Sequence, residues 1–281
     1  MPQHLPSFDN GNQPIVAEHN DYVPLVYFNR VRLNKGESHQ FQLKAHESCV
    51  VPVAGTLSVD VEGEVFDNIG TRTVLWEGKP NGVYVPVDSP CTITCQSESV
   101  EVFIAGGLFE ERYAPFAMRD DDIDLVQYGS DDTKTHRKIK HLLGQSNADK
   151  RGRLLVSELF TVGAGGWSGF PPHKHDTDRG DIETRFEEVY NFRFNPEGGF
   201  GAQFGYVNEH DFGPVFHIKH DSTYMIDRGY HPCVAAPGYE MYYFTIIVGE
   251  TQQSLKQFFE PAHEYQVHTI PGIKDMIAKF K

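Results

Sequence analysis

Short apolar stretches broken by glycine, proline, asparagine and aspartate follow one another along most of this chain. The stretch 57–61 reads LSVDV, and this alternation of apolar and polar positions is the pattern of a half-buried strand. Comparable apolar stretches lie at 25–28, 49–53, 83–87 and 102–104. Strands at such short spacing, with no helix-length segment between them, indicate an antiparallel barrel or sandwich and not a series of βαβ units.

A polar and charged segment at 129–152 interrupts this pattern, with one short helix or strand expected near 139–143. Strands resume after it and continue to residue 252, and the polar tail that follows ends in a predicted helix at 273–280. The later strands are expected at 153–160, 190–194, 201–207, 222–226 and 241–248.

The two halves of the chain present their features in the same order. Each ends in an apolar strand that leads to a glycine, at 103–106 and again at 246–249. We interpret this as an internal repeat of two barrels. The predicted division is a first barrel at 1–128, a linker at 129–152, a second barrel at 153–252 and a tail at 253–281.

Length, charge and cysteine content narrow the class of protein. The 281 residues suffice for one large β domain or two of ordinary size. A net charge of −14 argues against nucleic acid, whose phosphates require a basic face, but not against a small anionic substrate in a local cationic pocket. No stretch approaches the ~18 apolar residues of a membrane span, and the start lacks a basic-then-apolar leader. With four scattered cysteines and no CxxC pair, we expect a cytoplasmic protein with no membrane partner.

Two histidines one residue apart begin the candidate chemistry. His173 and His175 flank Lys174, and residues i and i+2 of a strand point to the same face, so both imidazoles are expected on one side. A histidine pair of this kind is a weak motif by itself, and a polar surface loop would explain it as well.

A carboxylate and a third histidine strengthen the case for a metal. Glu188 stands at the head of an aromatic strand face, where a charged group is costly unless it is paired or metal-bound. Glu187 alternates outward, and we interpret it as a surface salt-bridge partner. His231 follows the turn at Gly229. Imidazoles plus one carboxylate suit one divalent ion, with zinc as the first expectation and manganese or iron as alternatives.

This order of HxH, Glu and a later His resembles the metal signature of the cupin superfamily. More narrowly, the chain is similar to the 5-deoxy-glucuronate isomerase family of inositol catabolism over roughly 25–249. The matching motifs are PPHKHD at 171–176, EEVY at 187–190, PEGGF at 196–200, GYHP at 229–232 and PGY at 237–239, with GTR at 70–72, GKP at 78–80 and YVP at 84–86 in the first half.

The resemblance implies an all-β fold of two cupin barrels (double-stranded β-helix, jelly-roll) in tandem, with a short C-terminal helix and metal only in the second barrel. The first half agrees, because His39 and His46 do not have HxH spacing and the late turn at 85–88 has no histidine. A structural role is expected for the first barrel, either closing a sheet edge or joining copies in a homo-oligomer.

The activity implied by the resemblance is a metal-dependent aldose–ketose isomerisation. The substrate would be a small uronate-type sugar acid, 5-deoxy-D-glucuronate, converted to 5-dehydro-2-deoxy-D-gluconate. A divalent ion would act as a Lewis acid on the carbonyl. Tyr190 and Tyr243 are the candidate proton-moving residues. The candidate substrate-binding residues are Lys174, Arg185 and Arg228 for the carboxylate, and Gln203 and Tyr206 for hydroxyls.

Three alternatives remain open at this point. A 4-deoxy-5-keto-uronate isomerase of pectin breakdown would use the same metal chemistry, so only substrate assays separate it. An Fe(II) cupin dioxygenase would consume oxygen. A non-catalytic sugar-binding bicupin is disfavoured by the intact ligand set, because binding alone rarely requires a metal with open positions.

Overall fold

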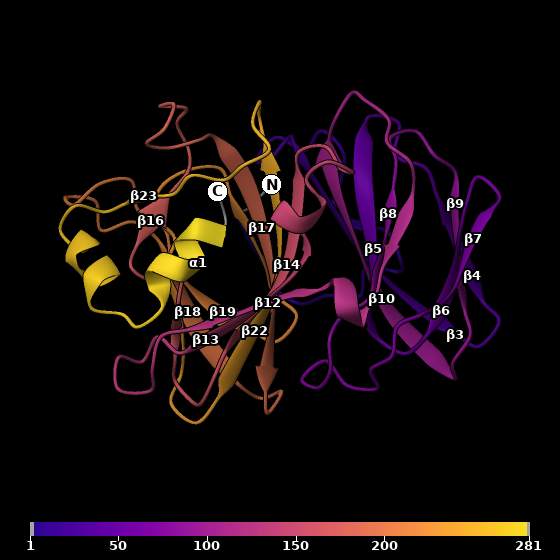
Figure 1. Cartoon of the computed structure of the whole chain (residues 1–281). Coiled ribbons are helices and arrows are strands. Elements are labelled where there is room, and N and C mark those ends of the chain that lie inside the picture. Colours follow the sequence, from indigo (N-terminus) through magenta and orange to yellow (C-terminus); the bar gives the residue numbers. More distant parts are fainter. Residues whose placement is uncertain (1–2, 280–281) are drawn as a thin grey trace.

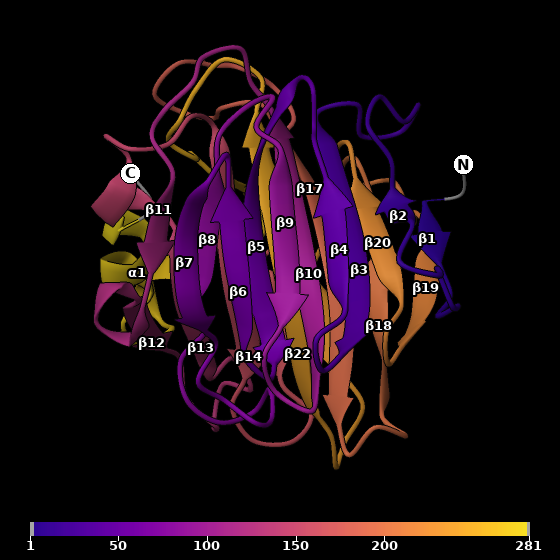
Figure 2. The same ribbon diagram turned by 90° about the vertical axis from the view of Figure 1, so that its right-hand side faces the viewer.

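Two β-barrels lie side by side in the computed structural model, which describes residues 3–279 (Figure 1). In the first barrel a six-stranded sheet of order β11-β8-β5-β10-β3-β2 faces a four-stranded sheet of order β4-β9-β6-β7 (Figure 2). These strands are β2 (Pro14–Val16), β3 (Val26–Asn34), β4 (Ser38–Phe41), β5 (His46–Ala54), β6 (Leu57–Val61), β7 (Glu64–Ile69), β8 (Gly82–Val85), β9 (Cys91–Cys95), β10 (Ser99–Leu108) and β11 (Phe116–Met118).

The second barrel has a seven-stranded sheet of order β1-β20-β17-β22-β14-β13-β12 and a four-stranded sheet of order β15-β21-β18-β19, and a separate pair joins β16 to β23. These strands are β1 (His4–Leu5), β12 (Asp124–Tyr128), β13 (Arg137–Leu143), β14 (Leu154–Thr161), β15 (Trp167–Ser168), β16 (His173–Lys174), β17 (Phe186–Asn195), β18 (Phe200–Phe204), β19 (Val215–Lys219), β20 (Thr223–Ile226), β21 (Cys233–Ala235), β22 (Glu240–Gly249) and β23 (Phe258–Phe259). The helices are α1 (Ile273–Lys279) and three short 3₁₀ segments, Asp120–Asp122, Gln145–Asn147 and Glu264–His268.

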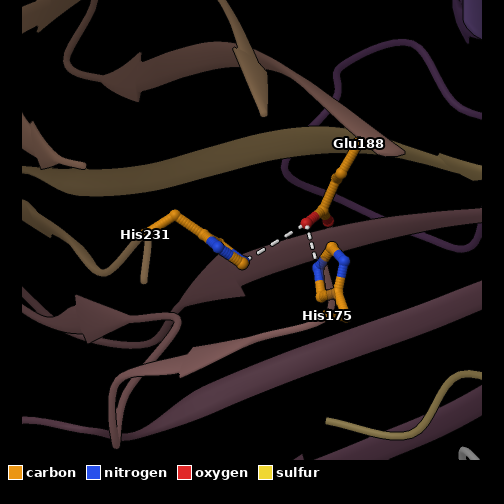
Figure 3. Close-up of side chains that lie close together, drawn as sticks. All are labelled: His175, Glu188 and His231. Carbon is orange, nitrogen blue, oxygen red and sulfur yellow. Dashed lines mark hydrogen bonds and ion pairs between the residues drawn. The ribbon is translucent and has the colours of Figure 1, made fainter. Parts of the chain in front are cut away.

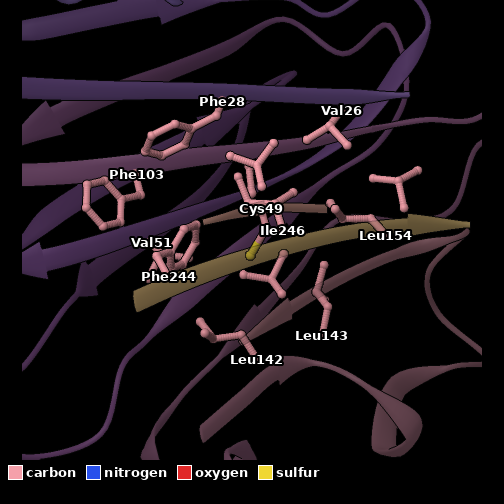
Figure 4. Close-up of a cluster of buried hydrophobic side chains, with 14 of the residues drawn as sticks. Val26, Phe28, Cys49, Val51, Phe103, Leu142, Leu143, Leu154, Phe244 and Ile246 are labelled. Atoms are coloured by element: carbon pink, nitrogen blue, oxygen red, sulfur yellow. The ribbon is translucent and has the colours of Figure 1, made fainter. Parts of the chain in front are cut away.

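The two large sheets pack face to face, and a hydrophobic core fills the space between them (Figure 4). Phe103 of the first barrel lies with its ring centroid 4.9 Å from that of Phe244 of the second. Val102 and Ile104, its neighbours on β10, point instead into the interior of the first barrel. Strands of the large sheets are therefore apolar on both faces, which explains why their sequences do not alternate.

Buried charges also join the two barrels. The guanidinium of Arg72, from the first half, binds both carboxylate oxygens of Glu158 on β14, at 2.7 and 2.5 Å. Glu47 of β5 accepts hydrogen bonds from the backbone N–H groups of Gly152 and Leu154, each at 2.7 Å. All three side chains are nearly inaccessible to solvent, so separating the barrels would leave uncompensated charges.

The predicted fold class is confirmed: the chain is nearly all β, forms two barrels of the cupin type, and has one short C-terminal helix. Of the helix expected at 273–280, residue 280 lies outside the described residues. Within residues 3–279, no helix is long and apolar enough to cross a membrane.

The segment predicted as a linker requires a correction. Residues 129–152 contain β13, which pairs with β12 on one side and β14 on the other, so both β12 and β13 belong to the sheet of the second barrel. The short helix or strand expected near 139–143 is this strand. Its place in the barrel was missed because its polar residues are buried: Arg137 and Lys140 are only 3% and 1% exposed.

Candidate metal centre

Three side chains from different parts of the second barrel meet in its interior (Figure 3). His175 follows β16, Glu188 lies near the start of β17, and His231 follows the turn after β20. The Nε2 atoms of His175 and His231 lie 3.2 and 3.4 Å from Oε2 of Glu188. All three residues are buried, at 2%, 4% and 1% exposed.

Backbone carbonyls fix the orientation of the imidazoles. Nδ1 of His175 donates to the carbonyl of Phe186 at 3.0 Å, and Nδ1 of His231 donates to that of Gly229 at 2.9 Å. A ring that donates from Nδ1 presents Nε2 to the site, as metal-ligating histidines commonly do. The other carboxylate oxygen of Glu188 accepts from the hydroxyl of Thr245 at 2.5 Å.

The electrostatics of this cluster favour a bound cation. Burial alone would raise the pKa of Glu188, but the neighbouring imidazoles of His175 and His231 outweigh it and hold that pKa well below its usual range. The carboxylate in turn raises the pKa of His175 against the effect of burial. Nε2 of His231 is buried without a hydrogen-bond partner. A divalent ion would replace the shared proton and engage this orphan nitrogen, so the residues fit a metal.

The fourth predicted ligand, His173, lies beside this cluster. Its ring centroid is 5.0 Å from that of His231, and its Nδ1 donates to the carbonyl of Pro171 at 3.2 Å. Its Nε2 accepts a hydrogen bond from the side-chain amide of Gln257 at 3.0 Å. Burial and the two neighbouring imidazoles lower the pKa of His173 well below its usual range, which keeps it neutral, as a ligand must be.

The C-terminal tail forms part of the site. Phe259 pairs with His173 in the β16–β23 ladder, and Leu255, Gln257 and Phe259 line the cavity beside the histidines. Met276 of α1 also lines it. Because the sequence of the tail shows no strand pattern of useful length, its contribution could not be predicted.

Both predicted catalytic tyrosines line the same cavity. The hydroxyl of Tyr243 is engaged on two sides, by Ser168 at 2.6 Å and by Arg137 at 2.8 Å. Within residues 3–279 the hydroxyl of Tyr190 has no hydrogen-bond partner. Burial raises the pKa of both phenols well above the usual range, so both stay protonated.

Residues 3–266 match the KduI/IolB family. The chain belongs to this family. It is 31% identical to the 5-deoxy-glucuronate isomerase of Bacillus subtilis (strain 168) over 251 residues, which are 89% of this chain and 90% of that protein. The isomerase of the same name from Halalkalibacterium halodurans is 30% identical over 257 residues, with coverage of 89% and 91%.

Solved structures agree with this membership. An IolB-like protein from Salmonella typhimurium LT2 superposes with a TM-score of 0.78 at 27% identity, covering 86% of this chain and 89% of that one. The oxalate decarboxylase of Lactobacillus farciminis shares the fold alone, with a TM-score of 0.62 at 11% identity over 100% of this chain and 97% of that one.

The three cations predicted to bind the substrate are each near a carboxylate of the chain itself. The ammonium of Lys174 lies 2.5 Å from Asp176 and 3.3 Å from Glu183. Arg185 forms a surface ion pair with Glu250 at 3.3 Å and is about half exposed. Arg228, the third candidate, is 72% exposed. None of the three lines the cavity, so none is in position to bind the substrate carboxylate there.

The two residues predicted to bind hydroxyls also lie outside the cavity lining. The amide of Gln203 donates to the backbone carbonyl of His231 at 2.8 Å, so it supports the turn that carries this histidine. The hydroxyl of Tyr206 donates to Glu260 of the tail at 2.6 Å. Both residues therefore position elements around the site and do not face its interior.

Glu187 is not the surface residue that the alternation indicated. It is 3% exposed, and its carboxylate accepts the backbone N–H of Leu25 in the first half of the chain at 2.8 Å. Burial raises its pKa to about 7. Glu187 does lie on the face of β17 opposite to that of Glu188, as the alternation predicts. That face, however, packs against the first barrel and not against water.

The residue that sequence reasoning missed is Arg137. It lies on β13, within the predicted linker, and lines the cavity together with Tyr128 and Tyr243. Its position in a polar stretch gave no signal of burial.

Proposed function

We propose that this protein is a metal-dependent aldose–ketose isomerase that converts 5-deoxy-D-glucuronate to 5-dehydro-2-deoxy-D-gluconate. The observation that carries the proposal is the buried cluster of His175, Glu188 and His231, of which His175 and Glu188 line a cavity that is also lined by protonated phenols. Membership of the KduI/IolB family and the names of the relatives support the substrate. These relatives do not favour a dioxygenase or a non-catalytic sugar-binding protein.

The metal set proposed is His173, His175, Glu188 and His231, with zinc first and manganese or iron as alternatives. For His173 to join, Nε2 would exchange its hydrogen bond from Gln257 for the ion. When bound, the ion supplies Lewis acidity that polarises the substrate carbonyl.

The reaction moves protons and no electrons leave the substrate. The hydrogen on C2 is transferred to C1, and the proton of the C2 hydroxyl is transferred to the C1 oxygen. Tyr190 is placed to serve this exchange, because its phenol is protonated and otherwise unengaged in the described chain, and it can donate to a substrate oxygen. Tyr243, held by Arg137 and Ser168, positions the cavity wall next to it, with the two tyrosine ring centroids 4.3 Å apart.

The test is NMR of the metal-loaded protein with 5-deoxy-glucuronate and, in parallel, with the 4-deoxy-5-keto-uronate from pectin. Conversion of the first alone supports the proposal. Conversion of the second alone would assign the protein to the pectin-derived substrate, and oxygen uptake with bound iron would replace isomerisation by dioxygenation.

We further propose a cytoplasmic homo-oligomer. The four cysteines are free and buried, which suits a reducing compartment. Light scattering of the purified protein gives the oligomeric state directly, and a monomeric mass would contradict this part of the proposal.

A further inference from the structure

We infer that Arg137 is the residue that binds the carboxylate of the substrate and makes the site specific for sugar acids. This inference rests on the proposed function, since it assigns one end of the substrate to one residue of the same cavity.

Arg137 carries a buried charge that lacks a counter-ion. The side chain is 3% exposed, and a guanidinium keeps its charge in proteins. Nη1 donates to the hydroxyl of Tyr128 at 2.9 Å and Nη2 donates to that of Tyr243 at 2.8 Å, and both acceptors are neutral. The Nε–H group is buried and has no acceptor. Within residues 3–279, no carboxylate lies at ion-pair distance from this guanidinium.

Other buried arginines of the chain have a carboxylate or several backbone carbonyls as partners. Arg72 binds Glu158 through two nitrogens, and Arg30 and Arg193 both bind Asp221. Arg151 donates from three nitrogens to backbone carbonyls of Gly144 and Gly152. Arg137 alone among these five lines the cavity, so an anion can reach it from there.

An unpaired buried charge is strongly unfavourable, and a ligand of opposite charge would relieve that cost. The planar guanidinium suits a carboxylate, which it can bind through two parallel hydrogen bonds. Glu188, the carboxylate of the same cavity, is already held by Thr245 and the histidines. The anion that pairs with the guanidinium of Arg137 therefore comes from a bound ligand and not from the chain.

The geometry also orients the substrate. The guanidinium carbon of Arg137 lies 6.0 Å from the ring centroid of Tyr243, which in turn lies next to Tyr190 and then His231. The rings of Tyr243 and Tyr190 thus form a series of contacts from Arg137 to His231. In 5-deoxy-glucuronate the carboxylate and the reacting aldehyde are at opposite ends of the carbon chain, so one end would face Arg137 and the other the metal.

The experiment compares a charged and a neutral ligand that cannot react. D-gluconate and D-sorbitol differ only in a carboxylate against a hydroxymethyl group, and neither has a carbonyl to isomerise. Calorimetry on the metal-loaded wild type should show gluconate binding on the order of 100-fold more tightly than sorbitol. Arg137→Gln should abolish this preference by weakening gluconate alone, and Arg137→Lys should restore part of it.

Arg185→Gln is the matched control, since it removes a surface arginine that is paired with Glu250. It should keep the wild-type preference. Circular dichroism checks that each variant folds, and the Lys variant retains a charge where the Gln variant does not. An Arg137→Gln protein that still prefers gluconate, or that loses both ligands equally, would overturn the inference.

Kinetics then separate the two proposals. With 5-deoxy-glucuronate and its C6 carboxamide as substrates, Arg137→Gln should lower kcat/KM for the acid far more than for the amide, and so remove the preference for the acid. If no uronate is turned over but gluconate binding still depends on Arg137, the proposed isomerisation fails while the anion site stands.

Discussion

Replacing Glu188 by glutamine tests the metal centre against a control on the same strand. Glu187 and Glu188 are adjacent on β17 and are 3% and 4% exposed, yet they face opposite sides. Glu188 meets two histidines, whereas Glu187 meets the backbone of Leu25. Glu188→Gln therefore removes the only carboxylate of the cluster, while Glu187→Gln removes an equally buried one that no metal would contact.

The magnitude follows from what each carboxylate holds. Substitution of a residue that merely supports a ligand costs 10–100-fold in metal affinity, so loss of the ligand itself should cost at least about 100-fold. A metal at 100 times its dissociation constant stabilises the wild type by about 2.7 kcal/mol, which corresponds to an unfolding temperature higher by about 5 °C for a chain of this length. Glu188→Gln should lose this increment, and Glu187→Gln should keep it.

The assay is thermal unfolding of protein treated with EDTA, with and without added Zn²⁺, combined with elemental analysis of bound metal. The amide of glutamine can still donate to the orphan Nε2 of His231, so the metal-free variant should fold. If Glu188→Gln retains one equivalent of metal and the full thermal shift, or if both variants lose the metal alike, the cluster is not the metal centre.

Three further outcomes are expected. Arg72→Met should lower the free energy of unfolding by about 3–5 kcal/mol in urea denaturation, because it leaves the buried carboxylate of Glu158 without its partner. Replacing both residues by methionine should recover part of this loss. Tyr190→Phe should lower kcat by roughly 100-fold while the metal content stays at the wild-type level; an unchanged kcat would remove Tyr190 from the mechanism. Burial and the neighbouring His19 lower the pKa of His46 to about 4, although the carboxylate of Glu18 lies 3.2 Å from Nδ1 and favours the protonated ring. Below pH 6.5 this histidine therefore binds a proton in the unfolded chain but not in the folded chain. The free energy of unfolding consequently falls from pH 6.5 towards pH 4. His46→Leu should reduce the loss between pH 7.5 and pH 5 by about 2 kcal/mol, measured by urea denaturation at both pH values.

Strands could be predicted where the pattern of apolar and polar residues within a short stretch reflects burial. The alternation at Leu57–Val61 and the apolar stretch within β5 are local signals, and both are strands in the structure. Strand β13 gave only a weak signal, a short helix or strand near 139–143, since its charged residues find partners far along the chain. The ammonium of Lys140 donates to the carbonyl of Gly78 at 2.6 Å, and Arg137 reaches Tyr243. A pattern that equates polar with exposed cannot assign a strand of this kind to the interior of a barrel.

The candidate site likewise contains residues that could be predicted from the sequence and residues that could not. His175, Glu188 and His231 stood out because each is a chemically conspicuous residue at a strand end or turn, and the structure brings them together. Gln257 and Arg137 are ordinary polar residues in stretches without periodicity. Their place in the cavity depends on how the tail packs against the second barrel and how β13 pairs within it. No spacing in the sequence predicts either arrangement.

Among the described residues the candidate metal cluster lies in the second barrel, yet the first barrel helps to orient the strand that carries Glu188. Side chains of β17 alternate between two cores: Tyr190 faces the interior of the second barrel, and Val189 faces the core between the barrels. On this second face Arg193 binds Glu101 of the first barrel at 2.9 Å, and Glu187 accepts the N–H of Leu25. Since a strand is pleated, fixing one face fixes the direction of the other. The tandem arrangement therefore contributes to the site without supplying a ligand: contacts with the first barrel set the register and tilt at which Glu188 meets the two histidines.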